Sequence, residues 1–275
     1  MPPPDPPTLP DAPRDFLRDC LRQWPSSHAL LRAIECRKLC RHPLDPPVLE
    51  VGCGDGILTR FLFSAPLAAG IDLNPREVRR ARKIQAHRAV QVASATHLPF
   101  RDRTFGGVFS NCVLEHVDSL DVALQEIARV LRPQGLLLTT VPTPRWETEG
   151  PIPLFHRWGW NRISATLNRI LRRLWHHVTL EEEAAWRLRL ARAQMTLVAW
   201  EPYMVPPAYA AYGRFLPFSV FSFVLRRLTG RWLVSRTLRS LVVPALSRLL
   251  RNAYLAEDTT GACALVLARK EPAGP

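Results

Sequence analysis

The sequence predicts an α/β fold in which a mostly parallel sheet of seven strands carries helices on both faces. Two observations lead to this prediction. Short apolar segments alternate with segments whose apolar residues recur at helical spacing. In the first unit, the apolar run 48–51 leads into Gly52, Gly54 and Gly56, and a helical pattern begins at Ile57. Strand, tight turn and helix in this order are typical of α/β proteins.

The expected elements follow in order along the chain. Residues 1–13 contain seven prolines and are expected to be a disordered tail. Two short helices are expected within 14–41, broken at Pro25, the second capped by Ser26 or Ser27. Later helices are expected at 57–65, 75–88, 119–131 and 179–193, the last capped by Thr179. Strands are expected at 48–51, 67–71, 89–93, 106–111, 135–141, 195–200 and 261–269.

The glycine turn and the tip of the second strand predict a ligand site. Glycine tolerates positive φ and lets a ligand approach the backbone N–H groups at the start of the next helix. Asp72 lies sixteen residues after Gly56, at the end of the second strand. A carboxylate at this position can accept hydrogen bonds from a ribose diol. The spacing alone suits NAD as well as other nucleosides.

Five segments make the chain resemble the class I S-adenosyl-L-methionine (SAM) dependent methyltransferases, in particular the methyltransferase type 11 group. They come in the order of that family and cover about residues 30–142. The resemblance implies a Rossmann-like SAM methyltransferase fold, methyltransferase activity and SAM as the cofactor. The matching segments are Glu50-Val-Gly-Cys-Gly-Asp-Gly56, Gly70-Ile-Asp72-Leu-Asn-Pro75, Ala95-Thr-His-Leu-Pro-Phe100 with Asp102 and Phe105, Val113-Leu-Glu-His-Val117, and Glu126-Ile-Ala-Arg-Val-Leu-Arg-Pro133 leading to Gly135.

The resemblance also implies which residues surround SAM. Many relatives have an acidic residue where Ser94 stands, so its hydrogen bond to the adenine amino group is expected to be weaker here. The cofactor-binding residues implied are Glu50 for the amino end of the methionine part, Gly52, Cys53, Gly54 and Gly56 around that part, Asp72 and Leu73 at the ribose, Ser94, Ala95 and Thr96 at the adenine edge, and Asn111 at the end of the fourth strand.

Two histidines are candidate catalytic residues, because an imidazole titrates near neutral pH. His116 follows the fourth strand, whose carboxyl end should open into the crevice. His156 lies in a segment rich in aromatic residues beyond residue 142, where the resemblance fades. For His116 and its neighbour Glu115, positioning of the loop is the alternative to proton transfer.

Composition limits the partners and the compartment. The net charge of +13 attracts phosphates, on nucleic acid or on anionic lipids, unless arginine is simply the default surface cation of this chain. Six cysteines without metal-ligand spacing predict free thiols and no metal site. No secretory signal is evident and no apolar stretch reaches the ~18 residues of a membrane span. We therefore expect a cytoplasmic protein, with peripheral association at the inner face of the membrane as a further expectation.

The chain is expected to divide into the tail (1–13), a SAM-binding methyltransferase core with N-terminal cap helices (14–202), a basic amphipathic helical insertion (203–258), and the final strand and tail of the core (259–275). From Tyr203 to Ala256 there are eight arginines and no acidic residue. Apolar helical stripes flanked by arginine are typical of helices at a membrane interface. A helical lid packed over the sheet is the alternative, and one element could do both.

The predicted function is SAM-dependent methyl transfer to a hydrophobic small-molecule or lipid-like acceptor, met at the membrane surface. A nucleic-acid methyltransferase is one alternative, motivated by the charge. The end of the fourth strand lacks the Asn/Asp-Pro-Pro-aromatic box of amino-methylating nucleic-acid enzymes, which argues against it. A non-catalytic SAM-binding scaffold is the other alternative, suggested by Ser94 and by the absence of an evident base. The acceptor and the oligomeric state are left open.

Overall fold

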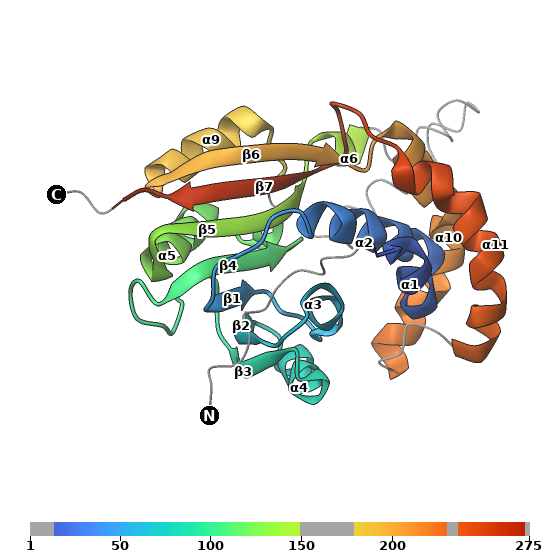
Figure 1. Ribbon diagram of the computed structural model, residues 1–275, viewed down its shortest axis with the longest axis horizontal. Helices are drawn as coiled ribbons and strands as arrows, with labels where there is room; N and C mark the ends of the chain where they lie inside the picture. Colours follow the sequence, from blue (N-terminus) through green and yellow to red (C-terminus); the bar gives the residue numbers. More distant parts are fainter. Residues whose placement is uncertain (1–13, 149–178, 230–235, 273–275) are drawn as a thin grey trace.

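A seven-stranded sheet forms the centre of the computed structural model, which describes residues 14–148, 179–229 and 236–272 (Figure 1). The strand order is β3-β2-β1-β4-β5-β7-β6. Only β7 among these strands runs antiparallel to its neighbours β5 and β6. The prediction of a mostly parallel sheet of seven strands is confirmed. The strands are β1 (Val48–Val51), β2 (Leu67–Asp72), β3 (His87–Val92), β4 (Phe105–Asn111), β5 (Leu131–Pro142), β6 (Met195–Tyr203) and β7 (Cys263–Lys270).

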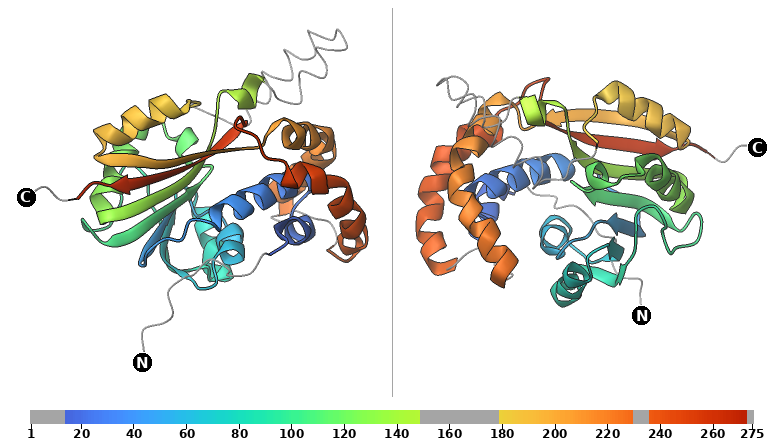
Figure 2. Two further views of the ribbon diagram at one scale, coloured as in Figure 1. Left: turned by 45° about the horizontal axis from the view of Figure 1, so that its top comes forward. Right: turned by 180° about the vertical axis from the view of Figure 1, so that it is seen from behind.

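Helices cover both faces of this sheet, as expected (Figure 2). Every residue of β1 and β4 is buried, which is why these strands are mostly apolar, with Glu50, Ser110 and Asn111 as buried polar exceptions. The helices are α1 (Phe16–Gln23), α2 (Ser26–Leu39), α3 (Ile57–Leu62), α4 (Pro75–Ile84), α5 (Leu120–Val130), α6 (Arg145–Thr148), α9 (Glu183–Arg192), α10 (Pro206–Thr229) and α11 (Arg236–Leu255), with a 3-10 turn η1 at Leu114–His116.

Two predicted helix caps are wrong. Helix α2 has Pro25 at its N-cap, and Ser26 and Ser27 lie inside the helix, where their side chains do not cap it. The Ser26 hydroxyl instead accepts a hydrogen bond from Arg239, 3.1 Å away. Helix α9 begins at Glu183, so Thr179 lies before it, and the Thr179 N–H donates to the carbonyl of Glu115. For Ser26 a tertiary contact takes the hydroxyl that the local pattern assigned to capping, and for Thr179 a backbone contact with Glu115 holds the residue outside the helix.

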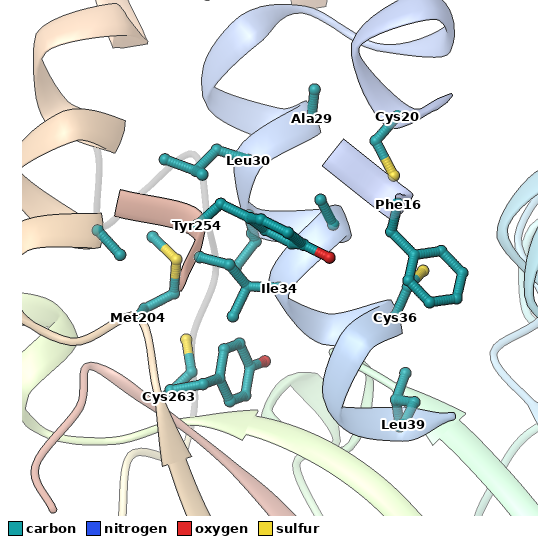
Figure 3. Packing of buried hydrophobic residues seen from close by; sticks show 14 of the residues in the cluster. Phe16, Cys20, Ala29, Leu30, Ile34, Cys36, Leu39, Met204, Tyr254 and Cys263 are labelled. Atoms are coloured by element: carbon teal, nitrogen blue, oxygen red, sulfur yellow. The ribbon is translucent and has the colours of Figure 1, made fainter. Parts of the chain in front are cut away.

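Four helices from the two ends of the sequence form a cap over the carboxyl ends of the central strands (Figure 1). Helix α10 packs against α2 and α11 packs against α1. Figure 3 shows Tyr254 of α11 beside Leu30 and Ile34 of α2, near Met204 and Cys263 at the ends of β6 and β7. These side chains belong to one buried apolar cluster. The insertion is therefore packed onto the N-terminal helices, and we call α1, α2, α10 and α11 the helical cap.

A polar contact fixes α11 to the N-terminal helices of this cap. The Arg239 guanidinium donates to the carbonyl oxygens of Leu21 and Trp24, at 2.8 and 3.3 Å. Both carbonyls lie where α1 ends, and helix ends leave such groups without intrahelical partners. Within the described ranges, the helices are all too short or too polar to cross a bilayer.

Candidate active site

The turn after β1 has the backbone geometry that its glycines predicted. Gly52, Gly54 and Gly56 have φ values of 77°, 51° and 77°, in the left-handed region. A Cβ at Gly52 would lie 2.3 Å from Cγ2 of Val113, whereas a Cβ at Gly54 would meet no described heavy atom within 4 Å. The first glycine is thus required by packing. The second borders open space, where a ligand can approach the backbone.

Asp72 faces this turn from the tip of β2. Its Oδ2 accepts a hydrogen bond from the Gly54 N–H at 2.9 Å, and its Oδ1 accepts one from the Asn74 N–H at 2.8 Å. Each carboxylate oxygen retains capacity for a second donor. The exposed side chain of Leu73 lies next in the chain. A carboxylate held beside the glycine turn fits the predicted hydrogen bonds to a ribose diol.

The strand order brings the other predicted cofactor residues to the same edge. Strands β3, β2, β1 and β4 are neighbours, and parallel strands place their carboxyl ends side by side. After β3, the hydroxyls of Ser94 and Thr96 lie 2.8 Å apart and the Thr96 N–H donates to Ser94 Oγ at 3.2 Å. Ala95 between them is buried. The Ser94 hydroxyl therefore stabilises its own turn, whatever it also does toward a ligand.

Glu50 lies in β1, before the turn, and Cys53 lies within the turn. The Glu50 carboxylate is buried, with Oε2 2.5 Å from the Thr59 hydroxyl and 2.5 Å from Nε2 of His87. These contacts link β1 to α3 and to β3. Cys53 is buried too, and burial raises the pKa of its thiol. Contact of Glu50 with the amino end of a bound methionine group stays a prediction, and linking these elements is its observed role.

A polar cluster, most of it buried, lies between the carboxyl ends of β4 and β5 and the helical cap. Hydrogen bonds join six of its members, and Glu115 lies near enough to feel the charges of Glu35 and Arg32. We call it the acceptor-side cluster: Arg32, Glu35, Asn111, Cys112, Glu115, Thr140 and Tyr203. Its centre is Glu35 of α2, whose side chain is fully buried. Glu35 accepts hydrogen bonds from Arg32 at 2.7 Å, Tyr203 at 3.0 Å, Cys112 at 3.2 Å and Asn111 at 3.4 Å.

Asn111 belongs to this network through both ends of its amide. Its Oδ1 accepts a hydrogen bond from the Thr140 hydroxyl at 3.1 Å, while its Nδ2 donates to Glu35. Cys112, which follows, has a φ of 51°, a rare value for a residue with a side chain. Strained backbone of this kind is concentrated at functional sites. The end of β4 therefore points its polar groups toward the cap.

Glu115 is the cluster member with an unpartnered oxygen. Its side chain is 2% exposed, and its Oε2 is buried without a hydrogen-bond partner among the described residues. Burial raises the pKa of this carboxyl to about 8, with a smaller contribution from the nearby Glu35 charge. His116, predicted as a catalytic residue, is 40% exposed, and its Nε2 is 3.9 Å from Glu115 Oε1. His156, the other candidate, lies outside the described residues.

Sequence reasoning missed Arg32, Glu35 and Tyr203. A signal for the first two was present, since Arg32 and Glu35 are one helical turn apart among residues that α2 buries on nearly all sides. Charged residues in a buried helix are rare unless they are paired. Tyr203 gave no comparable signal, because its role depends on β6 ending opposite α2.

The fold is that of a class I SAM-dependent methyltransferase domain. Residues 49–139 match the family described as "Methyltransferase domain". The predicted resemblance and SAM as the cofactor of this domain are thereby confirmed.

Two curated relatives illustrate the match. A malonyl-[acyl-carrier protein] O-methyltransferase of Erwinia pyrifoliae is 31% identical over 153 residues, which are 54% of this chain and 54% of that protein. A fatty-acid O-methyltransferase of Mycolicibacterium smegmatis is 40% identical over 107 residues, which are 36% of this chain and 38% of that protein. The matched parts thus span about half or less of the length of these relatives.

Two solved structures show the same fold. A SAM-dependent methyltransferase of Thermotoga maritima is 14% identical with a TM-score of 0.54, and the match covers 89% of this chain and 91% of that one. A geranyl diphosphate methyltransferase, solved with GPP and sinefungin, is 17% identical with a TM-score of 0.50, and the match covers 89% of this chain and 83% of that one. At these identities the likeness concerns the fold.

Proposed function

We propose that this chain is a SAM-dependent methyltransferase whose acceptor is a hydrophobic, lipid-like molecule reached at an anionic membrane surface. The observation that supports it best is the pairing of Asp72 with the Gly54 N–H beside open space, within a domain of the methyltransferase family. Asp72 would accept hydrogen bonds from the ribose hydroxyls. Gly54 has no side chain, so the methionine part of SAM could lie against its backbone. SAM, when bound, supplies an activated methyl group on a sulfonium.

Because SAM supplies the reactive methyl group, the protein's part in the reaction is to orient the acceptor and to exclude water. The helical cap closes the carboxyl edge of the sheet with apolar side chains, which suits an acceptor with a hydrocarbon part. The names of two relatives, which act on a malonyl-[acyl-carrier protein] and on a fatty acid, also support a lipid-like acceptor. We propose the acceptor-side cluster as the group that meets the reacting end of that molecule.

The outer surface of the cap supports the membrane part of the proposal. Leu241 and Leu249 of α11 and Leu228 of α10 are each more than two thirds exposed. Exposed arginines, Arg214 and Arg248, lie on the same two helices. Helices that combine exposed leucine with arginine bind anionic bilayer surfaces through burial and charge together. In this proposal the insertion is both the lid of the site and the surface that meets the lipid.

Binding of sinefungin or SAM to the purified chain, measured by calorimetry, tests the cofactor part. The wild type should bind, and Asp72→Ala should bind at least about tenfold more weakly, because hydrogen bonds to a charged group contribute roughly 1.5–3 kcal/mol. Circular dichroism should show that Asp72→Ala is folded. Equal affinity of the two proteins would contradict the assignment of Asp72.

Transfer of radiolabelled methyl from SAM tests the acceptor part. A total lipid extract, a long-chain fatty acid and an RNA pool serve as acceptors in parallel reactions. Label should enter the lipid extract or the fatty acid. Labelled RNA would instead favour the nucleic-acid alternative, which the net charge of +13 motivates. No transfer, in spite of SAM binding, would favour the non-catalytic scaffold.

A further inference from the structure

One arginine of the insertion reaches the cofactor side of the molecule. Arg226 lies near the end of α10, and its Nη1 is 2.7 Å from Oδ2 of Asp55 while its Nη2 is 3.1 Å from Oε2 of Glu77. Asp55 stands between two glycines of the turn after β1, and Glu77 lies in the first turn of α4. A single guanidinium therefore bridges the glycine turn after β1 and the start of α4.

The side chains of the bridge are largely buried, and both carboxylates make further contacts. All three side chains are less than a fifth exposed. The second oxygen of Asp55 accepts a hydrogen bond from the Ile57 N–H at 3.1 Å, and the second oxygen of Glu77 is 2.7 Å from Arg80. Partial burial limits screening by salt, and planar guanidinium groups suit two-carboxylate contacts. The arrangement therefore differs from a solvated surface ion pair, which contributes little.

Helix α10 also packs against α2, the helix that carries Glu35 of the acceptor-side cluster. It packs along α2, where the Ser219 hydroxyl accepts a hydrogen bond from the Ser27 N–H at 3.3 Å. Two turns further along α2 lies Glu35, the centre of the acceptor-side cluster. Helix α10 thus contacts α2 through its middle and the glycine turn near its end.

We propose that Arg226 is a positioning residue that fastens the helical cap across the cofactor turn, so that the cofactor exchanges only when the bridge to Asp55 and Glu77 opens. This inference rests on the proposed function, since it assumes that the turn binds SAM. Because the bridge crosses the glycine turn, its opening would precede both binding and release. Loss of the bridge should therefore speed both steps, whereas loss of a direct ligand contact would speed release alone.

Stopped-flow kinetics of sinefungin binding to the full chain test this. Arg226→Gln should raise the association and dissociation rates together, each by at least about fivefold, because gating steps limit exchange in many lidded enzymes. Arg226→Lys keeps the charge but has a single ammonium in place of the two guanidinium nitrogens, so its rates should lie between those of Arg226→Gln and the wild type. Arg187→Gln changes an arginine of α9 that is 59% exposed and pairs with Glu183, and it should leave both rates unchanged.

Two further measurements keep the proposal testable if Arg226→Gln folds poorly. Asp55→Asn retains the oxygen that accepts from Ile57 but removes the charge that pairs with Arg226, so it should speed both steps as well. Raising the salt concentration should speed exchange in the wild type more than in Arg226→Gln. Unchanged rates in Arg226→Gln, or a faster dissociation alone, would overturn the inference. Failure of the wild type to bind sinefungin would instead overturn the proposed function.

Discussion

Two glycines of the same turn have different physical requirements, although the sequence presents them alike. Both have positive φ, which costs a residue with a side chain roughly 1 kcal/mol or more. At Gly52 an added methyl group would also overlap Val113, whereas at Gly54 it would enter open space. The first position is therefore constrained by folding, and the second, in our proposal, by the ligand.

Alanine at each position should separate these roles. Gly54→Ala should fold with a loss of about 1 kcal/mol and bind sinefungin at least about tenfold more weakly, because its methyl group fills the ligand's space. Gly52→Ala should lose about 1–3 kcal/mol more, because overpacking adds to the strain. Urea unfolding and calorimetry measure both effects. Tight sinefungin binding by Gly54→Ala would show that the ligand does not approach this glycine.

Glu115 should make the stability of the protein depend on pH. The unfolded carboxyl has a pKa of 4.5, and burial raises the folded pKa to about 8. Between these values the folded state holds a proton that the unfolded state has lost. The stabilisation is complete below the unfolded pKa and is lost as the pH rises through the folded pKa. Glu115→Gln, which cannot ionise, should not show this loss.

Urea unfolding of wild type and Glu115→Gln between pH 5 and pH 9 checks this expectation. The difference in unfolding free energy should move in favour of Glu115→Gln by up to about 1.4 kcal/mol per pH unit until about pH 8. Glu183→Gln, which changes a carboxylate that is 44% exposed, serves as the control and should give a nearly constant difference. A constant difference for Glu115→Gln too would show that its carboxyl titrates normally.

At the scale of elements, α2 depends on a buried ion pair as well as on apolar packing. Glu35 is fully buried and its partner Arg32 is 18% exposed. Glu35→Gln would leave the Arg32 charge without its partner, and removing one member of a buried pair costs roughly 3–5 kcal/mol. We expect about 2–4 kcal/mol here, because Arg32 retains some access to water.

A double-mutant cycle measures the Arg32–Glu35 interaction. Adding Arg32→Met to Glu35→Gln should recover part of the loss, because the unpaired charge is removed. The exposed pair Arg187 and Glu183 is a matched comparison within α9, and Arg187→Gln should cost less than about 0.5 kcal/mol. Purely additive effects of the two substitutions in α2 would show that the pair does not stabilise this helix.

The sequence predicts the elements well wherever local pattern and tertiary structure agree. The glycine turn and the strands leading to Asp72 and Asn111 are examples, because their short-range signals are also what the sheet requires. The caps assigned to Ser26 and Thr179 fail because partners distant in sequence engage these residues. Asn111 of the acceptor-side cluster was predicted as a site residue, but its partners Glu35 and Tyr203 were missed for the same reason. Glu35 and Tyr203 are 168 residues apart, and only the folded chain brings them together.

At the scale of the whole molecule, the net positive charge and the exposed leucines of the helical cap favour binding to the same kind of surface, an anionic bilayer. The net charge is +13, and two arginines of the insertion, Arg226 and Arg239, bind other parts of the molecule. The exposed leucines lie on the outer side of the same helices. Charge can bring the cap to an anionic bilayer, and the leucines can then enter its interface. Each contribution should be separable by experiment.

Flotation with lipid vesicles separates the contribution of charge from the contribution of the exposed leucines. Wild type should float with phosphatidylcholine vesicles that contain phosphatidylglycerol, and less with phosphatidylcholine alone or in high salt. The variant with both Leu241→Ser and Leu249→Ser, two exposed positions two turns apart on α11, should partition at least about tenfold less, since each buried leucine contributes roughly 1.5–3 kcal/mol. Leu188→Ser, at an equally exposed leucine of α9 on the far side of the sheet, is the matched control and should float as the wild type does.

The two leucines of α11 are exposed, so their replacement should leave the unfolding free energy within about 0.5 kcal/mol of the wild type. A loss of flotation therefore reports on the surface and not on folding. If the double variant floats as well as the wild type, the cap does not insert into the bilayer and serves only as a lid. Flotation that falls equally with Leu188→Ser would mean that general hydrophobicity, and no particular face, drives the binding.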